Sequence, residues 1–229
     1  MSIDRAPSAE LRARVLAEIA RTPSPTRTEF KRRILLVAGI GTVATAAIFV
    51  AMGGMSPGAR PAEMIAFTVG SGLVAVAVLT RLSSPSGSGG DRSMLGRPRS
   101  VLLASVVASA PLLAIVAVLA SMMWPEPAAE HAGGGAHLAC GAMSVLQGAL
   151  PLLALIVPRR GSDPVHPAIT GAALGMTAGA WTVVMAYLRC PHADALHCVL
   201  AHVVPTLILT ALGAVLGFVF LRVRSTLEP

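Results

Sequence analysis

The chain has 229 residues, of which 54% are hydrophobic and only 13% are charged. Since a soluble domain carries about 25% charged residues, this composition excludes an ordinary soluble globular protein and favours a membrane protein. Eighteen Lys and Arg residues against eleven Asp and Glu residues give a formal net charge of +7. In a membrane protein such an excess reflects topology and contact with anionic lipid, so we expect the bilayer as a partner and no direct binding of nucleic acid.

Residues 1–33 form a basic segment in which we predict a short amphipathic helix. Ser8 can cap the start of this helix, and Pro23 and Pro25 end it. A helix of this length is marginal in water by itself, so its apolar stripe either lies on the lipid surface or docks into a groove on a partner protein. The stripe consists of Leu11, Val15, Leu16 and Ile19.

Six apolar segments follow, each long enough or nearly long enough for the roughly 20 helical residues that cross a bilayer. They are residues 34–53, 62–80, 100–124, 138–157, 168–188 and 199–221. We therefore predict an all-α fold, a polytopic membrane bundle of six transmembrane helices over residues 34–221. A short tail, residues 222–229, follows the bundle.

The basic residues are distributed unevenly over the connections between these segments. Sixteen of the eighteen lie in the N-terminal segment, in the second and fourth connections and in the tail. Only Arg60 and Arg189 lie in the other three connections. Because Lys and Arg accumulate in short loops on the cytoplasmic side of a membrane, we predict that both termini are cytoplasmic.

This topology gathers the cysteines and nearly all histidines on the predicted outer face. All three cysteines lie there, and five of the six histidines, His166 being the exception. A random distribution would scatter these residues over both faces, so the asymmetry is the strongest functional signal in the sequence. The outer residues are Cys140, Cys190, Cys198, His131, His137, His192, His197 and His202.

Three hypotheses account for this gathering. In an oxidising compartment the cysteines would form a disulfide, either Cys190 with Cys198 or Cys140 with Cys190, which leaves one thiol over. Alternatively, the residues bind zinc or another soft transition metal, because Cys198 and His202 lie four apart on one helix face and further Cys and His ligands are near. The candidate ligands are Cys190, His192, His197, Cys198 and His202. In the third hypothesis, the small cysteines merely pack in the core.

The rest of the sequence carries no catalytic pattern. We find no nucleophile triad, phosphate-binding loop or carboxylate pair, so we expect that the protein is not an enzyme. The spans offer few buried ionisable groups, which a transporter or pump would need.

Three features occur together in this chain: six spans with short connections, an N-terminal helical segment that ends in a Pro-rich turn with Arg27, and a late Cys-Pro motif followed by histidines. In these features the chain resembles the NrsF-type membrane anti-sigma factors. The resemblance implies that the N-terminal segment holds an extracytoplasmic-function sigma factor at the bacterial inner membrane. It also implies a pair of outer-face cysteines that responds to heavy metal or oxidative stress, and Cys140 and Cys190 match this pair by position. The chain departs from the family pattern by its additional Cys198, His192, His197 and His202.

We therefore expect an anti-sigma factor that sequesters its sigma factor through residues 8–22, assisted by Arg27 and the basic residues 31–33. A metal or oxidative signal at the outer cysteines and histidines would release the sigma factor. A small metal-handling or thiol-redox membrane protein, active in transport or disulfide exchange, is the alternative.

Overall fold

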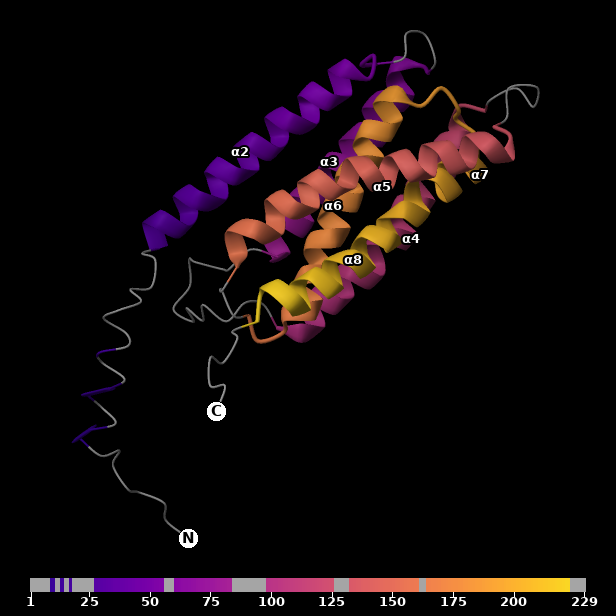
Figure 1. Ribbon diagram of the computed structural model, residues 1–229. Helices are drawn as coiled ribbons and strands as arrows, with labels where there is room; N and C mark the ends of the chain where they lie inside the picture. Colours follow the sequence, from indigo (N-terminus) through magenta and orange to yellow (C-terminus); the bar gives the residue numbers. More distant parts are fainter. Residues whose placement is uncertain are drawn as a thin grey trace.

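The computed structural model describes residues 9–10, 13–14, 17, 27–55, 60–83, 98–125, 132–160 and 164–222. Within these residues all regular secondary structure is helical (Figure 1). The elements are α2 (Arg27–Ala51), α3 (Ala62–Ser83), α4 (Arg99–Met123), α5 (Gly134–Ile156), the 3₁₀ turn η2 (Val157–Arg159), α6 (Pro167–Arg189), α7 (Ala195–His197), the π-helical segment η3 (Cys198–Val203) and α8 (Val204–Phe220).

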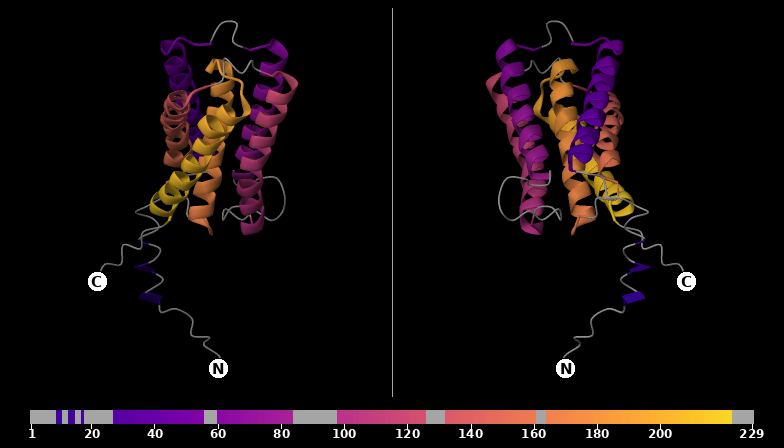
Figure 2. Two further views of the ribbon diagram at one scale, coloured as in Figure 1. Left: turned by 90° about the vertical axis from the view of Figure 1, so that its right-hand side faces the viewer. Right: turned by 90° about the vertical axis from the view of Figure 1, so that its left-hand side faces the viewer.

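Among the described residues, six helices are long and apolar enough to cross a membrane. The sixth comprises α7, η3 and α8, which run without a break from Ala195 to Phe220. The helices lie side by side, with the start of α2 and the end of α8 at the same end of the bundle (Figures 1 and 2). The predicted all-helical fold with six apolar spans is confirmed.

The first helix begins earlier than its apolar segment, whose candidate membrane span is Arg32–Ala51. The apolar segment begins at residue 34, but α2 begins at Arg27 and carries basic residues in its first turns. Arg and Lys are good helix formers, so the backbone hydrogen bonds of the helix continue beyond the apolar stretch. Arg27, expected in a turn, is the first residue of α2. The expected boundary between residues 33 and 34 therefore lies inside a continuous helix.

The predicted N-terminal helix is only partly described. Residues 9–10, 13–14 and 17 have a helical backbone, and the carboxylate of Glu10 accepts a hydrogen bond from the guanidinium of Arg14 at 3.0 Å. This spacing of four residues is the one expected on a helix. Leu11, Val15, Leu16 and Ile19 lie outside the described residues, so the apolar stripe stays a prediction.

Helix α6 is the centre of the bundle. It packs against α3, α4, α5 and α8, and 72% of its most apolar stretch is buried, against 12% for α2. The contact between α6 and α8 is close because glycines of α6 lie directly against the backbone of α8. A Cβ at Gly175 would lie 2.8 Å from the Cα of Thr210, and one at Gly179 would lie 2.8 Å from the Cα of Thr206. Such small residues let membrane helices approach where lipid supplies no hydrophobic drive.

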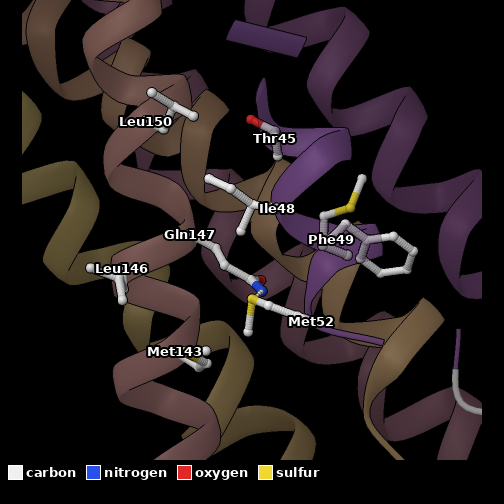
Figure 3. A pocket seen from close by; sticks show the side chains of 9 residues that line it. Thr45, Ile48, Phe49, Met52, Met143, Leu146, Gln147 and Leu150 are labelled. Carbon is white, nitrogen blue, oxygen red and sulfur yellow. Dashed lines mark hydrogen bonds between the residues drawn. The ribbon is translucent and has the colours of Figure 1, made fainter. Parts of the chain in front are cut away.

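Helix α2 lies at the side of the bundle and packs mainly against α5. Gly41 makes the closest approach, since a Cβ there would lie 2.7 Å from the Cβ of Ala154. Nearer the other end of α2, a cavity of about 200 Å³ separates α2 from α5. In this cavity the Gln147 amide points at the sulfur of Met52, with Nε2 and Sδ 3.4 Å apart (Figure 3). The contact between α2 and α5 is therefore close at Gly41 and open around Met52.

Candidate functional site

The cysteines and histidines meet at the end of the bundle where α6 ends, α7 lies and α5 begins (Figure 1). Three side chains approach most closely, and their ligand atoms all lie within 4.8 Å of one another. These are Cys140, Cys190 and His197, which we call the ligand triad. Cys190 Sγ lies 3.1 Å from His197 Nε2. The triad draws one residue from α5, one from the end of α6 and one from α7.

Local backbone structure positions each member of the triad. Cys140 lies in the second turn of α5. Cys190 is the C-cap of α6, and its backbone N–H donates to the carbonyl of Ala186 at 2.7 Å. The Asp194 carboxylate caps the next helical turn by accepting from the backbone N–H of His197 at 2.8 Å. Asp is one of the preferred residues at such caps. Asp194 therefore fixes the backbone position of His197, the histidine of the triad.

Three other histidines surround His197. Its ring centroid lies 5.0 Å from that of His137, 5.1 Å from that of His192 and 5.1 Å from that of His202. His137 makes the direct contact, with the two Nδ1 atoms 2.9 Å apart. One nitrogen of this pair must donate and the other accept, so the contact couples the tautomers of the two rings.

The π-helical segment η3 follows from Pro205. Proline has no N–H and its ring clashes with the carbonyl four residues earlier, so the backbone carbonyl of Ala201 loses its normal helical partner. The Ser144 hydroxyl lies 3.1 Å from this carbonyl and 3.1 Å from Nδ1 of His202. Ser144 thus links α5 to the start of the last span. Single π turns occur frequently at functional sites.

Cys198 lies apart from the triad. It is fully buried in a core cluster with Leu113 and Tyr187, and its thiol is within hydrogen-bonding reach of Tyr187 and Arg60. The Arg60 guanidinium stacks 5.0 Å over the Tyr187 ring and donates to the backbone carbonyl of His192. Cys198 directly follows His197 in the chain. A step of one residue turns a helical side chain by roughly 100°, which accounts for the different surroundings.

Burial raises the pKa of the Cys190 thiol to about 12. The uncharged thiol is therefore the dominant form at neutral pH, and a metal ion would have to displace its proton. All three cysteines are unbridged.

The structure brings together part of the predicted set. Cys140, Cys190 and His197 meet in the triad, His192 and His202 lie beside it, and Cys198 faces the core. His131 lies outside the described residues. Sequence reasoning placed His137 on this face without a role and missed Ser144, Asp194 and Arg60. The signal for His137 and Ser144 was available, because residues 137, 140 and 144 have the spacing of one helix face.

Two thiols and one imidazole can do two kinds of chemistry. Cysteine sulfur and histidine nitrogen are the ligands of zinc and other soft or borderline metals. Two thiols at this separation can also be oxidised to a disulfide after a small movement. Both reactions would pull the start of α5 towards the end of α6.

A family model described as NrsF, negative regulator of sigma F, matches residues 19–223. No curated protein matches the chain, and no solved structure matches it.

Proposed function

Because the chain belongs to the NrsF family of negative regulators of sigma F, we propose that it is an inner-membrane anti-sigma factor for an extracytoplasmic-function sigma factor. Residues 8–22 bind the sigma factor on the cytoplasmic side, assisted by Arg27. The family match over residues 19–223 supports the anti-sigma role, and the predicted apolar stripe is the reason for assigning binding to residues 8–22. Occupation of the sigma factor's polymerase-binding surface would then keep the sigma factor inactive by simple competition.

The arrangement of α2 supports this proposal. The helix begins at Arg27, with residues 23–26 between it and the proposed binding segment, and only 12% of its most apolar stretch is buried in the bundle. A loosely packed helix can change its position at small energetic cost. Movement of α2 would therefore change how the binding segment is presented.

The apolar stripe is the part to test. Replacing Leu11, Val15 and Ile19 together by Asp removes three side chains that each contribute roughly 1.5–3 kcal/mol when buried. Since about 1.4 kcal/mol corresponds to a tenfold change in affinity, sigma-factor binding should fall by several orders of magnitude. The measurement is co-purification of the sigma factor with the full chain, together with transcription from a sigma-dependent promoter.

A matched control exists on the opposite face of the same helix. Ala9, Ala13 and Ala17 are exposed and repeat every four residues, so the triple replacement of these alanines by Asp adds the same charge off the stripe. The control should keep the sigma factor bound. Equal binding by both triple variants would rule out the docking stripe, and lipid contact would then be the better role for this segment.

The ligand triad is proposed as the sensor. The end of α6 and the start of α5, which carry the triad, lie at the opposite end of the bundle from the start of α2 (Figure 2). Helix α5 connects the two ends because it carries Cys140 and packs against α2. A ligand or oxidant shifts such an equilibrium only if it favours one packing state over the other. Drawing Cys140 and Cys190 together would move α5 relative to α6, and α2 would follow α5.

A further inference from the structure

We propose that Cys140, Cys190 and His197 bind one soft divalent cation of the zinc and cadmium class, with His137 as the residue that orients the histidine ligand. This inference deepens the sensor role and rests on the proposed function for its consequence, while metal binding itself is measured separately. The histidines are the new element, because they make the site more than a pair of thiols.

The distances fit a metal site that needs little rearrangement. With Zn–S of about 2.3 Å and Zn–N of about 2.0–2.1 Å, tetrahedral geometry places two sulfurs about 3.8 Å apart and sulfur and nitrogen about 3.6 Å apart. In the structure, Cys190 Sγ and His197 Nε2 are 3.1 Å apart, and all three ligand atoms lie within 4.8 Å. The one short separation is about 0.5 Å below its required value, and the 4.8 Å limit on the others is about 1 Å above theirs, so shifts of about 1 Å or less complete the site.

The contact with His137 also allows the tautomer of His197 that metal binding requires. To bind a metal through Nε2, the ring must carry its proton on Nδ1, and that atom lies 2.9 Å from Nδ1 of His137. His197 Nδ1–H then donates to His137, as metal-binding histidines usually donate their second nitrogen to a neighbouring acceptor. The Asp194 cap fixes the backbone of the same residue. His197 is therefore oriented from both its ring and its main chain.

Three protein ligands leave one coordination position open in a tetrahedral ion. Each thiol releases its proton to solvent when it binds, so occupation neutralises the cation by two thiolates. Metal binding requires Cys140 to approach Cys190 and His197, and thus couples occupancy to the packing of α5 against α6.

The test uses the purified full chain in detergent, reduced and titrated with Co²⁺ alone. Thiolate-to-cobalt charge transfer reports the number of sulfur ligands, and the visible bands report tetrahedral geometry. We expect one Co²⁺ per chain with two thiolates, and Zn²⁺ and Cd²⁺ should displace it. His137→Gln should lower affinity roughly 10–100-fold, the usual effect of losing a partner of a metal ligand. His197→Gln should lower it further and change the visible bands.

Two controls separate the outcomes. Cys198→Ser should leave the two-thiolate absorption unchanged, whereas Cys140→Ser and Cys190→Ser should each remove about half of it. Unchanged affinity and bands in both histidine variants, or a loss of absorption in Cys198→Ser, would overturn the assignment of ligands. Sigma-factor binding by the same preparations without metal tests the proposed function independently, since that binding depends on residues 8–22.

Discussion

Cys190 has a structural role through its backbone and a chemical role through its thiol. It caps α6 through its backbone, and its side chain is buried against His197. Burial disfavours the thiolate, which is the form that reacts with oxidants and alkylating agents. The thiol is therefore poorly reactive until something displaces its proton, which a soft cation does directly.

The raised pKa of Cys190, about 12, predicts slow alkylation. In a variant with Cys140→Ser and Cys198→Ser, iodoacetamide should react with folded protein at least about a hundredfold more slowly near pH 8 than with protein unfolded in detergent. The alkylation rate should increase with pH, because below the raised pKa the thiolate fraction of Cys190 grows about tenfold per pH unit. In the folded protein this increase should continue beyond the pH at which an exposed thiol is fully ionised. A plateau near pH 8.5 in the folded protein, where an exposed thiol titrates, would show that the thiol is accessible.

Individual residues were only partly predictable. The approach of Cys140 and Cys190 could be expected. Cys140 lies near the start of one span and Cys190 just after the end of the next, so both lie on the same side of the bundle. The separation of Cys198 from His197 could not, because it depends on the helical phase at the start of the last span. That phase is set by the Asp194 cap and by the π segment before Pro205.

At the scale of elements, helix α2 is the part of the bundle with the fewest constraints. Its contact with α5 rests on the close approach at Gly41 and on the weak contact between Gln147 and Met52. A cavity lies beside that second contact. Such a contact transmits movement of α5 while it costs little to rearrange.

Gly41→Leu should uncouple α2 from α5. Its side chain would meet Ala154, because the Cβ alone would lie 2.7 Å from the Ala154 Cβ, and overpacking of this kind costs about 1–3 kcal/mol. We expect a lower unfolding midpoint in detergent and weaker induction of sigma-dependent transcription. Gly39→Leu is the matched control, since no atom lies within 4 Å of a Cβ at Gly39. Equal induction in the two variants would argue against transmission through this contact.

The elements themselves were largely predictable from apolar length. Membrane helices must satisfy their backbone hydrogen bonds internally, so each long apolar segment forms a helix. The ends were less predictable. Polar residues extend α2 back to Arg27, and the last span begins at Ala195 through α7 and η3, ahead of its apolar stretch.

In the whole molecule, the proposed sensor and the start of the helix that follows the proposed binding segment lie at two ends of one bundle. The ligand triad lies at one end, and α2 begins at the other (Figure 1). The sixteen-to-two distribution of basic residues predicts that the triad faces the outside and the binding segment faces the cytoplasm. A bundle with this orientation can report external chemistry to a cytoplasmic sigma factor without any ligand crossing the membrane.

The central claim is that chemistry at the triad cysteines releases the sigma factor. The most direct measurement is sigma-dependent transcription after cadmium and after peroxide, in cells that carry the wild-type chain, Cys140→Ser, Cys190→Ser or Cys198→Ser. The account predicts that Cys140→Ser and Cys190→Ser each repress normally but fail to induce, while Cys198→Ser has a smaller effect. Normal induction by both agents in the Cys140→Ser and Cys190→Ser strains would contradict it.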